Sequence, residues 1–455
     1  MKQLFTALLA AALLSMSCGP DMEAARASAE RAEDLLNQAA LRQAQYPEYP
    51  QEPQWQDYEG WEDYEAAVEA YDDALTAIRG DLRYDGTWEA LESFAGRSTA
   101  LILREREGEN TVYSPISLWT ALAMLVECSG EESRAQVLSA LGAADPADLR
   151  EQVSYMWQSL YTDDGIRTLI LANSLWLSDR LEAHYAPETL DVLAQDYFAD
   201  TYAVPMGDSS ADEAITAWIA EQTRGLIGTD APAVKTDSAT LLLLASSLYY
   251  KAAWSGGFDS GSTEEDIFTC ADGTETRIDF MHKIQDNASF LREDDWQAAY
   301  LRLSTGSMTF VLPDEGISPE ALLQDEDFLS NLIDWNDSHS GIVEWSVPKF
   351  DASSTLNLPG TLEALGIRDL IDPGRADLTA LTDLPAYLGD AKQLTRVKVD
   401  EEGVEAAAAT IMAVPLMGAL TPEEPEICVM DLDRPFLFVI SVEDFPLFVG
   451  VVNQV

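Results

Sequence analysis

Residues 401–410 have the composition of a segment that can change its place in a fold. An acidic start leads through a glycine into a run of small side chains. Glycine lacks a Cβ and can act as a pivot, while small side chains pass beside a pleated strand without overlap. Such a segment can lie in solvent in one state and enter a sheet in another, although an alanine-rich helical turn is the alternative. Its members are Glu401, Glu402, Gly403, Val404, Glu405, Ala406, Ala407, Ala408, Ala409 and Thr410.

The neighbouring segments favour the strand interpretation. Residues 394–399 alternate between Leu394, Arg396 and Lys398 on one side and smaller or apolar residues on the other, which is typical of a strand. Residues 411–425 read as an exposed loop, and two apolar strands then close the chain. The mobile segment would therefore lie next to a strand that precedes it directly.

Conventional catalytic or metal chemistry has little support. The chain contains three histidines, His184, His282 and His339, and none has a metal-ligand spacing. A nucleophile elbow and a phosphate loop are also absent from the sequence. We expect no enzyme activity, no cofactor and no metal site, and we expect the cysteines after Cys18 to be buried thiols.

Several blocks in order along the chain resemble the serpin family. They cover roughly residues 85–455, and this many blocks in the family's order is a specific signal. The hinge above matches the start of the family's reactive loop. The other blocks are 110–117 (Asn-Thr-Val-Tyr-Ser-Pro-Ile-Ser), 248–254 (Leu-Tyr-Tyr-Lys-Ala-Ala-Trp), 347–350 (Val-Pro-Lys-Phe), 433–438 (Asp-Arg-Pro-Phe-Leu-Phe) and 446–453 (Pro-Leu-Phe-Val-Gly-Val-Val-Asn).

The resemblance implies an α+β fold in which helices pack around a large mixed main sheet with smaller sheets and an exposed reactive loop. It also implies an irreversible, mechanism-based inhibitor of serine or cysteine proteases. The protease attacks the loop and forms an acyl-enzyme, the hinge then enters the main sheet as a new strand, and the trapped enzyme is distorted. The alternative is a serpin-fold binding or surface protein that does not inhibit.

The cleaved bond follows from the family's spacing. Counting sixteen residues on from Glu401 gives Met417–Gly418, with Leu416–Met417 as the second choice because the loop is longer than is typical. Residues 411–425 contain no lysine or arginine. We therefore expect target proteases with an apolar specificity pocket, such as elastase-, chymotrypsin- or subtilisin-like enzymes.

The alternation of side chains in a strand provides a test of the insertion idea. One face of the inserted segment would carry only small or apolar residues, which a sheet can bury. Non-inhibitory relatives often place a bulky charge near the start of this face. These residues are Val404, Ala406, Ala408, Thr410, Met412 and Val414.

A second group of residues resembles the region that lets the family's main sheet open. The family often has asparagine where Ser246 lies and histidine where Gln393 lies, so these two residues could form one exchanged hydrogen-bonding pair. Ser114 and Ser117 are the expected partners, and Trp254 marks the top of the main sheet. The alternative is that Ser246 and Gln393 are ordinary strand residues.

The charge restricts the possible partners. With Lys+Arg 27 against Asp+Glu 80 the formal net charge is −53, and the pI is near 4.1. Nucleic acids and sulfated polysaccharides are unsuitable partners, because anions bind clustered lysine and arginine. A well-solvated surface explains the acidity, and a salt-rich habitat is the alternative.

The N-terminal region has the features of an export signal. Residues 1–18 combine Lys2, a short apolar run and small residues before Cys18, which looks like a bacterial lipoprotein box. We expect a lipid-anchored monomer outside the cell membrane, with the membrane contacted only through the lipid, or else a plainly secreted protein. Residues 19–85 are expected to be an acidic stalk or an unstructured tail, with a helix over 61–80, and 86–455 the folded domain.

Overall fold

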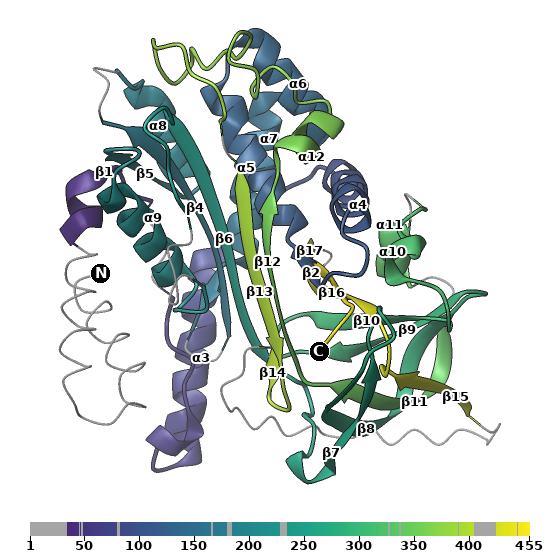
Figure 1. Ribbon diagram of the computed structural model, residues 1–455. Helices are drawn as coiled ribbons and strands as arrows, with labels where there is room; N and C mark the ends of the chain where they lie inside the picture. Colours follow the sequence, from purple (N-terminus) through teal and green to yellow (C-terminus); the bar gives the residue numbers. More distant parts are fainter. Residues whose placement is uncertain are drawn as a thin grey trace, which may run out of the picture.

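The protein is described from a computed structural model, which covers residues 34–44, 46, 49–79, 82–164, 167–179, 184–227, 234–325, 328–335, 338–389, 391–404, 425–443 and 445–455. Helices pack against two large sheets, as Figure 1 shows, so the α+β prediction is confirmed. Residues 405–424 and Cys18 lie outside the described residues. The predicted cleavage sites Met417–Gly418 and Leu416–Met417 and the hinge residues from Glu405 to Thr410 are among them.

The two central strands of the main sheet coincide with long apolar runs of the sequence. The runs 168–178 and 240–250 form the neighbouring central strands β4 and β6, and every residue of β4 is buried. Burial on both faces explains why β4 reads as a continuous apolar run. In spatial order the strands are β1 (Ala40–Arg42), β5 (Ala199–Val204), β4 (Thr168–Ser178), β6 (Leu242–Ala253), β14 (Gly403–Val404), β13 (Lys392–Val399) and β12 (Phe350–Asn357), and β3 (Thr162–Asp163) also pairs with β4.

The second sheet holds the strand that follows the predicted reactive loop in sequence and the last strands of the chain. Its edge strand β15 begins just after the loop and pairs in parallel with β11. In order the strands are β15 (Glu426–Asp431), β11 (His339–Pro348), β8 (Glu275–Arg292), β9 (Trp296–Arg302), β10 (Ser307–Pro313), β16 (Phe436–Val442), β17 (Phe445–Val452) and β2 (Thr111–Tyr113), and β7 (Thr263–Thr269) pairs with β8.

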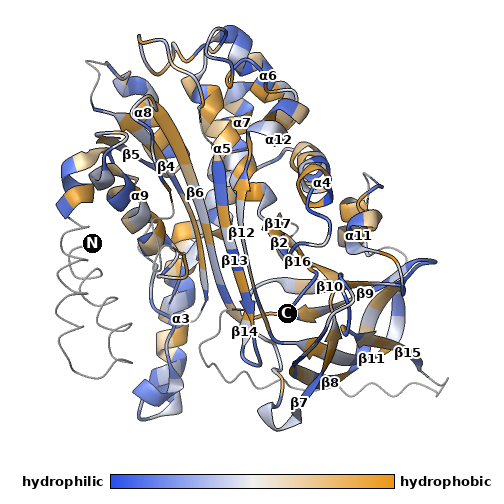
Figure 2. Ribbon diagram, viewed as in Figure 1, coloured by the Kyte–Doolittle hydropathy of each residue, from blue (hydrophilic) through white to orange (hydrophobic). Residues whose placement is uncertain are grey.

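Helix α5 (Pro115–Cys128) is the central helix of the domain. Proline at its first position and the Ser114 side chain, which accepts a hydrogen bond from the Ser117 amide, fix where it begins. Twelve of its residues are buried, and the ribbon in Figure 2 is coloured hydrophobic near the α5 label. The other helices are α4 (Glu89–Arg104), α6 (Glu131–Leu141), α7 (Pro146–Leu160), α8 (Pro187–Asp196), α9 (Ser209–Gln222), α10 (Pro319–Leu322), α11 (Phe328–Asp334) and α12 (Pro359–Ala364), with short 3-10 turns η1 (Trp55–Asp57) and η2 (Ser260–Ser262).

The segment before residue 80, expected to be a stalk, packs against the domain from residue 34 onward. Strand β1 extends the edge of the main sheet by pairing with β5. The half-buried ring of Tyr46 stacks on Trp157 and Tyr161 of the α7 end, with centroids 5.3 and 5.4 Å away. Aromatic stacking and edge pairing explain this docking. The helix expected over 61–80 is α3 (Trp61–Arg79).

Three further expectations concern residues that the structure describes. Cys128, Cys270 and Cys428 are free and buried, as predicted. Within the described ranges, no group of three or more histidine, cysteine, aspartate or glutamate side chains could hold a metal ion. None of the helices described is both long and apolar enough to cross a membrane.

Candidate functional site: the hinge and the gap beside it

The hinge begins as a two-residue strand held between two long ones. In β14, Gly403 pairs with Ala253 and Val404 with Ala252 of β6, while Val404 also pairs with Val399 of β13. At the far end of these strands, β6 and β13 meet directly through a parallel bridge between Leu244 and Ala391. A longer inserted strand would continue from β14 along the line between β6 and β13 (Figure 1).

The two residues of β14 meet different packing demands. A Cβ on Gly403 would overlap the carbonyl oxygen of Ala252 and lie 2.8 Å from the Ala253 Cα, so the close approach to β6 requires glycine. Val404 is 2% exposed, as expected for the first apolar residue of the insertion face. Gly403 and Val404 thus form a strand in this structure, and the role of residues 401–410 as a hinge stays a prediction.

Glu401 is held by a small polar network just before β14. Its Oε1 lies 2.7 Å from Lys349 Nζ and accepts a hydrogen bond of 3.0 Å from Thr263 Oγ1. Lys349 Nζ also lies 3.2 Å from Oδ2 of Asp279, a residue of β8. The network links the hinge to two strands of the second sheet and to the start of β12.

These contacts shift the acid–base properties of both partners. Burial opposes the ionisation of Glu401, yet the hydrogen bonds from Lys349 and Thr263 hold the pKa of its carboxyl below the usual value. The hydrogen bond that Lys349 donates to the Glu401 carboxylate raises the pKa of Lys349. The pair is therefore fully charged at neutral pH.

We expect the Glu401→Gln variant to be less stable than the wild type at pH 7 and equally stable in acid. A carboxyl with a lowered pKa stabilises the fold above its unfolded pKa of about 4.5, and this stabilisation is lost as the pH falls through the folded pKa. The difference at pH 7 should be about 1 kcal/mol, because the pair is partly exposed. Urea midpoints of both proteins at pH 7 and pH 3 measure it, and a pH-independent difference would contradict the assignment.

Trp254 fixes the same end of β6 against the hinge. Its indole Nε1 donates a hydrogen bond of 2.8 Å to the Asp400 carbonyl, and its backbone amide donates one of 2.9 Å to the Glu402 carbonyl. The ring is 4% exposed. Trp254 thus lies at the hinge end of the main sheet, away from the serines with which the sequence analysis grouped it.

The predicted sheet-opening residues meet near the N-terminus of α5. The buried Gln393 amide makes two hydrogen bonds of 2.9 Å with the Ser114 backbone, accepting from its N–H and donating to its C=O. The Ser114 hydroxyl donates to Ser117 Oγ at 2.9 Å. Gln393 therefore ties β13 to the start of α5, a role that its strand periodicity alone did not indicate.

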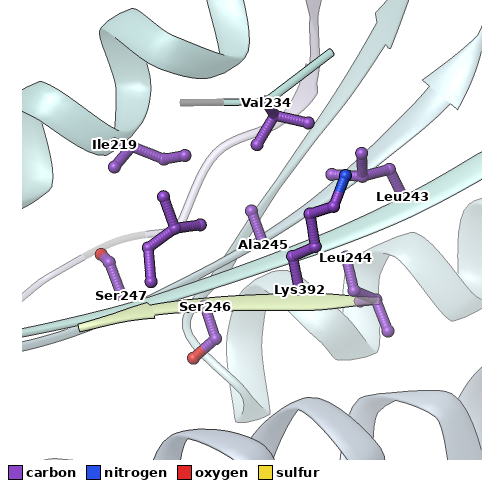
Figure 3. A pocket seen from close by; sticks show the side chains of 9 residues that line it. Ile219, Val234, Leu243, Leu244, Ala245, Ser246, Ser247 and Lys392 are labelled. Atoms are coloured by element: carbon purple, nitrogen blue, oxygen red, sulfur yellow. The ribbon is translucent and has the colours of Figure 1, made fainter. Parts of the chain in front are cut away.

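Ser246 lies on β6 and Gln393 on β13, and among the residues described these two side chains do not bond to each other. Both line a small cavity beneath the sheet, together with Ser117. A second cavity lies on the other face, between the β6–β13 pair and α9, and is lined by Ile219 and Val234. Figure 3 shows the Ser246 hydroxyl directed away from these two residues, toward the α5 side. The suggested exchange of one hydrogen-bonding pair is therefore wrong for this state, because Gln393 uses the Ser114 backbone.

Sequence reasoning missed the cationic and hydroxyl partners of this site. Lys349 was noted only inside a family block, and Thr263 was not noted at all. Thr395 was also missed, although its hydroxyl donates a 2.6 Å hydrogen bond to the Val112 carbonyl and so supports β13 from β2. The scarcity of cations, with Lys+Arg 27 in 455 residues, is the signal that could have drawn attention to Lys349.

Comparison with known proteins gives a consistent result. The sequence model of one family, described as Serpin (serine protease inhibitor), matches residues 89–455. Serpin-Z1C of Triticum aestivum is 30% identical over 368 residues, which span 76% of this chain and 90% of that protein.

Solved structures agree with the sequence comparisons. The thermophilic serpin tengpin in its native state is 27% identical with a TM-score of 0.72, covering 82% of this chain and 96% of its own. A thyroxine-binding globulin complexed with thyroxine has a TM-score of 0.67 at 23% identity, with 80% and 98% covered, and is similar in fold.

Proposed function

Because the chain belongs to the serpin family, whose members are generally protease inhibitors rather than enzymes, we propose that it inhibits proteases irreversibly through its reactive loop. One observation carries the proposal. The first two residues of the hinge already form a strand between β6 and β13, and Val404 is buried there. Insertion then extends an existing strand, so no new strand has to be nucleated.

The sequence after Val404 supports the same mechanism. The residues that would follow it on the buried face, such as Ala406 and Ala408, are small enough to enter the sheet. Cleavage at Met417–Gly418, with Leu416–Met417 as the second choice, would free the segment. The apolar residues at both bonds make elastase-, chymotrypsin- and subtilisin-like proteases the proposed targets. We also propose export and a lipid anchor at Cys18, with the domain acting outside the cell membrane.

The proposal predicts a covalent complex between the full chain and a protease with an apolar pocket. Incubation with elastase, chymotrypsin, subtilisin and trypsin, followed by denaturing gels, should show a complex that survives denaturant for at least one of the first three. Mass spectrometry should detect a released peptide that begins at Gly418. Trypsin is the internal control, because the loop offers it no lysine or arginine.

Complete cleavage without a complex for every protease with an apolar pocket would contradict the inhibitor proposal. That outcome would favour a serpin-fold protein that serves as a binding or surface protein. Released peptides beginning at Met417 would keep the mechanism and move the cleaved bond to Leu416–Met417.

A further inference from the structure

Four aromatic rings form an exposed cluster before the family-matched region begins. Tyr64 contacts Trp55, Tyr58 and Trp61, with ring centroids 5.4, 5.8 and 5.9 Å away. Trp55 is 52% exposed and Trp61 64% exposed, although tryptophan is highly buried on average. We call Trp55, Tyr58, Trp61 and Tyr64 the aromatic tip. Its rings hold one another in place, so a partner would meet a preformed surface.

The aromatic tip projects from the end of the main sheet. Tyr71, ten residues after Trp61, donates a 2.9 Å hydrogen bond to Asp164 Oδ2, and the Glu52 amide donates to the Asp164 carbonyl. The chain between these two anchors therefore leaves the sheet and returns to it. Ten residues of helix rise about 15 Å, so the start of α3 lies about that far beyond Asp164.

The hinge strand β14, which precedes the reactive loop, lies at the same end of the main sheet. Asp164 follows β3, and Thr168 of β4 pairs with Lys251, next to the β6 residues that hold β14. Only β6 separates β4 from β14, a distance of about 10 Å at ordinary strand spacing. Figure 1 shows the Trp61 end of α3 and β14 at the same, lower end of the molecule.

The charge around the aromatic tip selects the kind of partner. Residues 53–70 contain no lysine, arginine or histidine and carry six acidic residues: Asp57, Glu59, Glu62, Asp63, Glu65 and Glu69. Exposed ring faces with carboxylates beside them attract lysine and arginine side chains through cation–π contacts and ion pairs. Polyanions and anionic lipid surfaces are repelled by the same charges.

We propose that the aromatic tip is a docking surface for the protease that attacks the reactive loop, and that it selects proteases with a basic surface beside the active site. The inference rests on the proposed function, because it needs a protease at the loop. A protease domain of about 230 residues has a radius of gyration of about 17 Å. A protease bound at the loop therefore reaches far enough to contact a projection at the same end of the sheet.

The test compares rates of complex formation with two elastase-like proteases, one strongly cationic and one acidic. The full chain is compared with the double variant Trp55→Ala/Trp61→Ala and the triple variant Glu62→Gln/Asp63→Asn/Glu65→Gln. The matched control is Glu131→Gln/Glu132→Gln, which neutralises exposed acids on α6, away from the hinge end. Unchanged melting temperatures establish that each variant is folded, and the triple variant alters only side chains at the helix surface.

We expect both tip variants to react about tenfold more slowly with the cationic protease at low salt, because steering and specific contacts are lost. For both tip variants, the rate with the acidic protease and the number of inhibitor molecules consumed per protease should be unchanged. The control variant should form complexes at the wild-type rate. High salt should reduce the effect of the triple variant. If all variants form complexes at equal rates, the docking-surface proposal is overturned and the inhibitor proposal stands. If no protease forms a complex, both proposals are overturned.

Discussion

Replacing Val404 by arginine is expected to turn the inhibitor into a substrate. Val404 is 2% exposed and lies between Ala252 of β6 and Val399 of β13. An arginine held at this place in the sheet would bury an unpaired charge, at a cost of several kcal/mol, so the hinge strand is expected to leave the sheet and insertion to lose its starting point. Slower insertion lets the protease hydrolyse the acyl-enzyme first. The fraction of cleaved chain that is held in a covalent complex should fall at least tenfold.

The matched control introduces the same side chain two residues earlier. Glu402 is exposed, and its printed contacts use only its backbone: the carbonyl accepts from the Trp254 amide, and the amide donates to Asp400 Oδ1. Glu402→Arg should therefore keep most of the complex formation. Gel densitometry of complex against cleaved chain measures both variants, and circular dichroism establishes that each is folded. Equal complex formation by Val404→Arg and wild type would show that burial of this position in the sheet is not needed for inhibition.

Long buried elements were the most predictable part of the fold. Strand β4 and helix α5 are buried on nearly all sides, and both therefore read as continuous apolar runs in the sequence. Strand β1 was not predicted. Its three residues, Ala-Leu-Arg, lie in a segment of helix-favouring composition, and only pairing with β5 makes them extended.

The polar contacts of the site were less predictable than its location. The sequence placed Ser114, Ser117 and Gln393 in one region, and the structure brings them together. Their pairing depends on side-chain direction across strands far apart in sequence, which periodicity does not encode. Gln393 bonds to backbone atoms, and Ser246 faces the cavity instead.

The docked segment before residue 80 joins two parts of the molecule that insertion would affect differently. Strand β1 pairs with the edge strand β5, and Tyr46 stacks on the end of α7, while Tyr71 bonds to the β3–β4 turn. Part of the main sheet must shift if a full strand is to enter beside β6, because β6 and β13 meet at Leu244 and Ala391. The contacts that this segment makes with the domain therefore contribute to the free energy of the uncleaved state.

Cleavage of the reactive loop is expected to raise the melting temperature by more than about 10 °C. A strand that extends from β14 between β6 and β13 would make about a dozen new ladder hydrogen bonds. At about 1 kcal/mol each, and with added apolar burial, the gain is on the order of 10 kcal/mol. For a domain the size of residues 89–455, unfolding entropy is about 0.8 kcal/mol/K, which converts this gain into a rise of about 13 °C.

Scanning calorimetry of the chain before and after cleavage at the loop measures this rise. Cleaved Val404→Arg is the control, because the same bond is cut while insertion is hindered at its first step. Its melting temperature should rise much less than that of the cleaved wild type. If the cleaved wild type has the same melting temperature as the uncleaved chain, loop insertion does not stabilise the fold. Insertion could not then supply the free energy that traps a protease.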